Sequence, residues 1–222
     1  MAGTPHTVGD VMTQTVVAVG RAATFKEIVA TMERWKVSAL PVLAGEGRVI
    51  GVVSEADLLP KEEFRDRTPN RYDELRRLSD LAKAEAVTAE ELMTSPAVTV
   101  HAGATLAEAA RAMAIKGVKR LPVVDDVGKL QGIVSRADLL KVFLRPDEDI
   151  AEEVRHVVAA APFPALGDAQ VSVREGVVTL TGQVPDTSLV SVVVRLVRAV
   201  EGVVDVDARL THAPRSSPAG QP

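Results

Sequence analysis

The chain contains an internal duplication, and this feature constrains its fold more than any other. Residues 8–59 align with residues 89–140 at a constant offset of 81 and without a gap, and about 20 of the 52 aligned positions are identical. Identity on this scale is beyond chance, so the two segments must share one fold. The segments conserved between the copies are Met-Thr at 12–13 and 93–94, Leu-Pro-Val at 40–42 and 121–123, and Ser-x-Ala-Asp-Leu-Leu at 54–59 and 135–140.

Each copy predicts the element order β-α-β-β-α. A short apolar run, 16–19 or 97–100, has the length of a strand. A capping box then opens a helix, Thr24 to Glu27 in the first copy and Thr105 to Glu108 in the second. Two further apolar runs flank a glycine-containing turn and predict a hairpin, and a second helix begins at the serine that follows. The hairpin strands are predicted at 39–43 and 49–53, and at 121–124 and 130–134.

A smaller domain follows Pro146, with the order α-β-β-α-β. Its elements are predicted at 147–160, 171–173, 177–181, 188–200 and 203–210. The valine-rich segment 188–200 suits a strand or a helix by composition, but its length favours a helix, capped by Asp186 and Thr187.

These patterns predict an α/β (α+β) chain with five parts. At roughly 150 residues per domain, 222 residues suggest one or two domains. The division expected is a repeat at 1–60, a charged helical connector at 61–87, a repeat at 88–146, a small domain at 147–211 and a flexible tail at 212–222. The connector carries seven basic and seven acidic residues between Lys61 and Glu85, which fits an exposed helix, or alternatively a helix that contacts an effector.

Composition excludes several classes of protein. A net charge of −4 and an aromatic content of 3% argue against a nucleic-acid-binding protein. The absence of cysteine excludes disulfides, thiolate metal sites and a cysteine nucleophile. The sequence shows neither a signal peptide nor an apolar run long enough to span a membrane, so we expect a cytoplasmic protein.

No catalytic or metal-binding motif emerges, and we expect a protein that is not an enzyme. The four histidines are scattered, and no Gly-x-Ser-x-Gly elbow is present. The glycines at 45, 47 and 51 miss the dinucleotide-binding fingerprint and fit a hairpin turn. The remaining hypothesis of this class is an unrecognised hydrolase, but the sequence shows no nucleophile paired with a general base.

The repeated Ser-x-x-Asp motif, Ser54 to Asp57 and Ser135 to Asp138, has two interpretations. It can be a simple capping box. Alternatively, the serine leaves amide N–H groups at the helix start for a phosphate, and the aspartate accepts hydrogen bonds from ribose hydroxyls. Duplication copies caps as readily as sites, so recurrence alone does not decide.

The repeats resemble the CBS domain family, regulatory modules that occur as tandem pairs. The resemblance rests on Met-Thr, Leu-Pro-Val and the Gly-Val-Val-Ser-Glu-Ala-Asp-Leu or Gly-Ile-Val-Ser-Arg-Ala-Asp-Leu segment. It implies a pseudo-symmetric pair, a homodimer, and an adenosine-containing ligand such as AMP, ADP, ATP or S-adenosylmethionine in a cleft between repeats. The nucleotide-binding residues it implies are Val37, Ser38, Ala39, Ser54 and Asp57 from the first copy, and Val118, Lys119, Arg120, Ser135 and Asp138 from the second.

The copies differ where a phosphate would lie. The second has Lys119 and Arg120 where the first has Ser38 and Ala39. Charge-assisted hydrogen bonds to phosphate are about twice as strong as neutral ones, so we expect the second copy to supply most of the phosphate contacts. The alternative is an exposed basic pair without a ligand.

Residues 147–211 resemble the BON domain family, through Gly-Val-Val-Thr-Leu-Thr-Gly-x-Val at 176–184 and Val-Glu-Gly-Val-Val-Asp-Val at 200–206. That resemblance implies binding of phospholipid or of a partner. With 5 basic and 11 acidic residues, this domain would be repelled by an anionic bilayer, so a protein partner is the better expectation and membrane binding the weaker one.

The leading hypothesis is therefore a cytoplasmic nucleotide sensor that relays ligand occupancy to its C-terminal domain or to a protein partner not identified by the sequence. No covalently bound cofactor is implied. The alternative is a ligand-free dimerising scaffold that presents the C-terminal domain.

Overall fold

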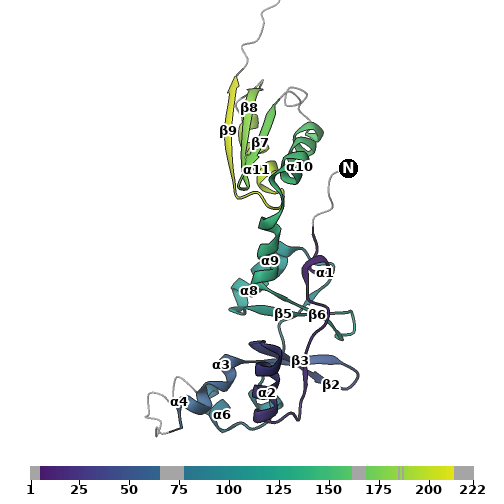
Figure 1. The fold of residues 1–222 in the computed structure, drawn as a ribbon, viewed down its shortest axis with the longest axis vertical. Helices are drawn as coiled ribbons and strands as arrows, with labels where there is room; N and C mark the ends of the chain where they lie inside the picture. The colour runs from purple at the N-terminus through teal and green to yellow at the C-terminus, as the bar shows by residue number, and fades with distance from the viewer. Residues whose placement is uncertain (1–5, 66–77, 162–168, 185, 187, 213–222) are drawn as a thin grey trace, which may run out of the picture. The chain divides into compact units, whose positions relative to one another are not determined.

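The computed structural model describes residues 6–65, 78–161, 169–184, 186 and 188–212 (Figure 1). The chain is a mixed α/β protein, as predicted, and it divides into two compact units. The first unit spans Thr7–Asp138 and contains both repeats; the second begins at Leu139 and includes His6. The middle of the connector, 66–77, and the tail from 213 onward lie outside the described residues, so the prediction of a flexible tail stays a prediction.

Both repeats have the predicted β-α-β-β-α order, each preceded by a short helix. The first repeat consists of α1 (Val8–Val11), β1 (Val19–Gly20), α2 (Phe25–Trp35), β2 (Ala39–Ala44), β3 (Arg48–Ser54) and α3 (Glu55–Leu58). Helices α4 (Pro60–Glu63) and α6 (Leu78–Glu85) belong to the connector. The second repeat consists of α7 (Ala89–Leu92), β4 (Val100–His101), α8 (Leu106–Lys116), β5 (Arg120–Val124), β6 (Leu130–Ser135) and α9 (Arg136–Leu140), followed by a 3₁₀ turn, η1 (Lys141–Leu144).

Each repeat builds a three-stranded sheet. In the first, β1 pairs parallel with β2, and β2 pairs antiparallel with β3; the second repeat has the same topology with β4, β5 and β6. The first strand is shorter than predicted, since only Val19 and Gly20 of the region around 16–19 join the ladder. The physical reason is that the chain just before it, at Thr13, is paired with the other repeat, and the residues between cross from one sheet to the other.

The predicted capping boxes begin α2 and α8. Thr24 donates its backbone N–H to the Glu27 carboxylate at 2.7 Å, and Thr105 does the same to Glu108 at 2.9 Å. Both helices end in a left-handed residue, which in the second repeat is Gly117 (φ 67°) and in the first is Lys36 (φ 53°). The first repeat therefore places a side chain where the second has none.

The two repeats exchange their opening segments. Thr13 forms a bridge with Ile133 of the second repeat, and Thr94 forms one with Val52 of the first. Behind these bridges, the core of the first repeat includes residues from the far side of the connector, namely Ala86, Ala89 and Leu92. Each Met-Thr segment thus covers the outer edge of the other repeat's sheet, and the two repeats form one compact unit.

The second unit has the predicted α-β-β-α-β order. Its elements are α10 (Asp147–Ala160), β7 (Gln170–Arg174), β8 (Val177–Val184), α11 (Ser188–Arg198) and β9 (Asp205–His212). Strand β8 lies in the middle, antiparallel to β7 and parallel to β9 (Figure 1). The segment 188–200 is a helix, as its length predicts, and Asp186 accepts a hydrogen bond from Ser188 N at 2.8 Å at its start; Thr187 lies outside the described residues.

One face of this sheet forms the core with both helices. Val154 of α10 and Val197 of α11 are fully buried, together with Val178 and Leu180 of β8. Across the described residues, no helix has both the length and the apolarity that a membrane crossing requires.

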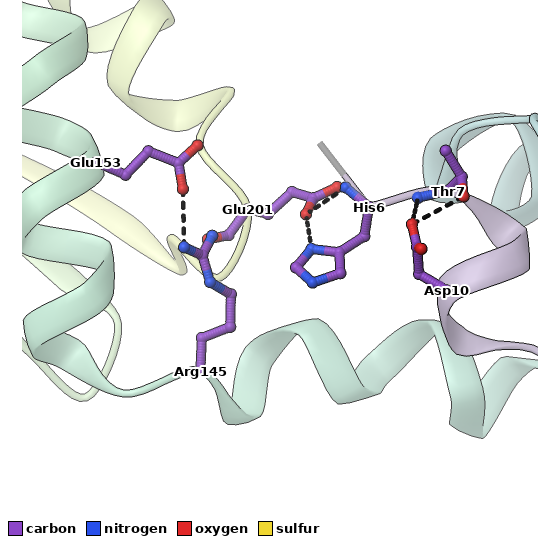
Figure 2. Close-up of polar contacts among 6 residues, drawn as sticks. All are labelled: His6, Thr7, Asp10, Arg145, Glu153 and Glu201. Atoms are coloured by element: carbon purple, nitrogen blue, oxygen red, sulfur yellow. Dashed lines mark hydrogen bonds and ion pairs between the residues drawn. The ribbon is translucent and has the colours of Figure 1, made fainter. Parts of the chain in front are cut away.

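Arg145, just before α10, connects the start of this domain to the turn that precedes β9 (Figure 2). Arg145 donates to the Glu201 carbonyl at 2.7 Å and to the Glu153 carboxylate at 2.8 Å. The Glu201 carboxylate in turn accepts from His6 N at 3.1 Å and lies 2.6 Å from His6 Nδ1. A single guanidinium thereby links η1, α10 and the turn before β9.

Candidate functional site

The Ser-x-x-Asp motif forms a capping box in both repeats. Asp57 Oδ2 accepts hydrogen bonds from Ser54 N at 2.7 Å and from Ser54 Oγ at 2.6 Å. Asp138 Oδ2 accepts the same pair of bonds from Ser135, at 2.9 and 2.6 Å. Each box lies where the chain passes from the last strand of a sheet into a helix. It uses only Oδ2 of the aspartate, so the hydrogen-bond donors to Oδ1 must come from elsewhere.

In the first repeat, the Oδ1 atom of Asp57 contacts two side chains that follow residue 77 in the chain. Lys83 of α6 forms an ion pair with it, and Thr94 Oγ1 donates to it at 3.4 Å. Asp57 is 7% exposed, and among the residues that the structure describes it is the charged residue that is buried. The pair compensates this burial, because an unpaired buried carboxylate is costly.

Neither Lys83 nor Thr94 was among the site residues expected from the sequence. Thr94 did carry a signal, since it belongs to the repeated Met-Thr pair, but that pair contributed to the family resemblance and indicated no ligand contact. Lys83 carried none, because it is one of seven basic residues in a connector of balanced charge.

A cavity of about 230 Å³ opens beside Asp57, within the unit formed by the two repeats. Three parts of the chain line it: in the first repeat, the start of β2, the end of β3 and helix α3; the segment after Met93; and the loop that leads from α8 into the start of β5. The described lining residues are Ser38, Ala39, Val52, Ser54, Glu55, Ala56, Asp57, Thr94, Ala97, Val98, Gly117, Val118, Lys119 and Arg120.

The basic pair of the second repeat faces the Ser-x-x-Asp motif of the first. Lys119 and Arg120 both line the cavity that Ser54 and Asp57 line. Arg120 also donates from Nη2 to Ser38 Oγ at 2.7 Å, which fixes the guanidinium across the gap between repeats. The cavity thus has two acidic residues, Glu55 and Asp57, several hydroxyls and two cations on its walls.

The structure gathers seven of the ten expected residues around this cavity. They are Ser38, Ala39, Ser54, Asp57, Val118, Lys119 and Arg120. Val37 lines an adjoining open groove of about 410 Å³, which Ser38 and Arg120 also reach. Ser135 and Asp138 are not among the residues that line either space. The cations of the second copy therefore line the same cavity as the motif of the first copy, while Arg120 is also paired with Ser135 of its own copy in the β5–β6 ladder.

This arrangement can bind a ligand that carries both hydroxyl donors and an anion. A carboxylate at one wall accepts hydrogen bonds from a diol, and the lysine and arginine at another wall neutralise a phosphate or carboxylate. The apolar side chains Val52, Ala97 and Val98 offer a surface for a flat ring.

A comparison with family models decides the identity of the repeats. The CBS domain model matches residues 8–61 and 89–145, which together make up half of the chain. The chain belongs to the CBS domain family. The BON domain model matches residues 146–214, so a CBS pair is followed by a BON domain, as both resemblances predicted.

Two curated proteins are similar in sequence to this chain. Uncharacterized protein MK0525 of Methanopyrus kandleri is 30% identical over 135 residues, covering 61% of this chain and 61% of that protein. The chloroplastic CBS domain-containing protein CBSX2 of Arabidopsis thaliana is 30% identical over 155 residues, covering 63% of this chain and 64% of that protein. The chain thus spans less than two thirds of the length of either relative.

Solved structures show the same fold for the pair. The crystal structure of CBSX2 in complex with AMP superposes with a TM-score of 0.55 at 30% identity, and it covers 63% of this chain and 97% of that one.

Proposed function

We propose that this protein is a regulatory sensor that binds an adenosine-containing nucleotide in the cavity between its CBS repeats. In this proposal the ribose lies at Asp57 and Ser54, and the phosphates lie at Lys119 and Arg120. The observation that carries it is that one cavity is lined by both the Ser-x-x-Asp motif of the first repeat and the basic pair of the second. A nucleotide is a ligand that needs both.

The AMP complex of CBSX2 supports this choice of ligand class, since that protein shares the fold of the pair at 30% identity. The cavity of about 230 Å³ is somewhat smaller than the roughly 300–1,000 Å³ of typical small-molecule sites, so we expect the cavity to widen on binding. Ser135 and Asp138 belong to a second, weaker site in this proposal, because the residues that correspond to Lys119 and Arg120 are the uncharged Ser38 and Ala39.

The proposal extends to the rest of the chain. The pair assembles as a homodimer in the cytoplasm and has no catalytic activity of its own. It signals occupancy to the BON domain or to a protein partner, and neither a nucleic acid nor a membrane is its target. A ligand can shift such a system only by its differential affinity for two arrangements of the repeats.

A thermal-shift series tests the proposal. AMP, ADP, ATP, S-adenosylmethionine and NADH are each added to wild type, Asp57→Asn and Asp138→Asn. At a hundred times its dissociation constant a ligand stabilises the native state by about 2.7 kcal/mol, which is a readily measured shift for a chain of this size. We expect one adenine nucleotide to stabilise wild type and Asp138→Asn but not Asp57→Asn. A shift that Asp138→Asn loses and Asp57→Asn keeps would instead place the site in the second repeat.

The second candidate function is a ligand-free scaffold, and one observation favours it: Asp57 already has protein partners on both oxygens. In that case Lys83 and Asp57 form a permanent structural pair, and the repeats only dimerise the chain and present the BON domain. The same thermal-shift series separates the two functions, since a scaffold responds to none of the five compounds.

A further inference from the structure

The carboxylate of Asp57 has no acceptor capacity left for a ligand. Two carboxylate oxygens provide about four lone-pair positions. In the structure, Oδ2 accepts from Ser54 N and Ser54 Oγ, and Oδ1 accepts from Lys83 and Thr94. A ribose brings two further hydroxyl donors, so it must displace donors already present.

Of these donors, the two from Ser54 belong to the turn into α3, and Thr94 is paired through its backbone with Val52. Lys83 differs from them because it comes from the connector, on a helix that has no buried residue of its own. Its side chain, 20% exposed, reaches an Asp57 side chain that is 10% exposed. The donor most easily withdrawn is therefore the lysine.

The connector helix is held over this site by two lysines. Lys83 reaches out of α6 to Asp57, and Lys61 of α4 donates to the carbonyl of Ala84 in α6 at 2.8 Å. Helix α6 also packs against α3, the helix that Asp57 caps. When Lys83 leaves the carboxylate, α6 loses its ion pair with the Ser-x-x-Asp motif of the first repeat.

We propose that Lys83 is a built-in competitor for the ribose position at Asp57, so that nucleotide binding releases helix α6 of the connector. This inference rests on the proposed function and names its regulation. The ligand and the docked helix exclude each other at one carboxylate, and linkage makes the effect reciprocal. Any interaction that stabilises docked α6 weakens nucleotide binding, and nucleotide binding weakens the docking of α6 to the same extent.

The test compares Lys83→Met with wild type by calorimetric titration of AMP and of 2′,3′-dideoxy-AMP. Because the dideoxy compound lacks the hydroxyls that compete with Lys83, its affinity should not change. For AMP we expect Lys83→Met to bind about five- to tenfold more tightly, in the range of ordinary coupling between sites. Lys83→Arg, which keeps a cation for Asp57, should stay close to wild type. The matched control is Lys26→Met, the same change at an exposed position of α2, which should leave both affinities unaltered.

Hydrogen exchange on wild type gives a readout that needs no variant. Saturating AMP should accelerate exchange of the amides in 78–85, while the dideoxy compound should not. Exchange that is unchanged or slower with AMP would overturn the proposal.

The titrations separate this inference from the proposed function. If wild type and Lys83→Met both fail to bind AMP, the proposed function fails, and the inference falls with it. If wild type binds AMP and Lys83→Met binds it equally or less tightly, the function stands and Lys83 is not a competitor. An equal gain for AMP and the dideoxy compound would also overturn the inference, because it would show an effect of charge rather than of the ribose hydroxyls.

Discussion

Met93 of the second repeat packs directly on Gly51 of the first. A Cβ atom built on Gly51 would lie 2.4 Å from Met93 Sδ and 2.8 Å from its Cγ. The duplication repeats this contact, since a Cβ on Gly132 would lie 2.5 Å from Met12 Sδ. The methionine of one repeat thus requires the glycine of the other, which explains why both recur in the sequence.

We predict that Gly51→Ala destabilises the first unit by about 1–3 kcal/mol, the usual range for overpacking. Gly20→Ala is the control, because nothing lies within 4 Å of a Cβ at that position and the second repeat has His101 there. Urea unfolding followed by fluorescence of Trp35, the chain's single tryptophan, reports on the first repeat. Equal midpoints for the two variants would contradict the packing described.

Lys36→Gly should stabilise the first repeat. Lys36 ends α2 in the left-handed region at φ 53°, where a side chain costs about 1–2 kcal/mol, and glycine at Gly117 serves the same position in the second repeat. The exposed pair of Lys36 with Glu33 offsets little of this cost. Allowing for the greater entropy of an unfolded chain with glycine, we expect a gain of about 0.5–1 kcal/mol in the Trp35-reported transition. A loss of stability would show that the Lys36 side chain contributes more than its backbone costs.

Arg145→Met should destabilise the BON domain by about 1–3 kcal/mol, because it leaves the Glu153 carboxylate and the Glu201 carbonyl without their shared donor. Both side chains of the Arg145 and Glu153 pair are largely shielded, at 20% and 17% exposure. Arg209→Met is the control, since Arg209 and Asp207 form an exposed pair worth at most about 1 kcal/mol. The measurement is hydrogen exchange of the α10 amides, which should accelerate only for Arg145→Met.

The capping glutamates make stability depend on pH in the acid range. Hydrogen bonds from the Thr24 backbone and side chain lower the pKa of Glu27 below its ordinary 4.5, and bonds from Val87 and Thr88 lower the pKa of Glu91 likewise. A carboxylate with a lowered pKa in the folded state contributes stability above its unfolded pKa and loses it as the pH falls through the folded value. In the double variant Glu27→Gln, Glu91→Gln, the side-chain amide oxygens still accept the hydrogen bonds of the capping boxes, but the side chains do not titrate. Its urea midpoint should therefore fall less than that of wild type as the pH drops below 4.5. Parallel curves for the two proteins would contradict the assignment.

The sequence predicted the elements well, because capping and turn signals are local and the duplication displays each of them twice. Thr24 with Glu27, the turn between β2 and β3, and the helix after Asp186 follow from residues a few positions apart. The alignment of Met12 with Met93 revealed equivalence, but it carries no information on which repeat each methionine packs against. Only the fold shows that the opening segments are exchanged.

Seven of the ten residues predicted for the site line the cavity, but the sequence did not predict which of them lie together. Lys119 and Arg120 were identified by the charge difference between copies, yet the copy they face is set by how the repeats pack. Lys83 could not have been found from the sequence, because its contact with Asp57 depends on α6 packing against α3. The length and charge of the connector do not predict where α6 packs.

In the proposed function, one cavity joins a ribose-binding carboxylate from the first repeat to a phosphate-binding pair from the second. Calorimetric titration of AMP into wild type and into Lys119→Gln, Arg120→Gln tests it most directly. We expect one tight site per chain in wild type, and an AMP affinity weakened about tenfold or more in the variant, because two charge-assisted contacts are lost. Equal AMP affinity in the two proteins, or no binding to wild type, would contradict it.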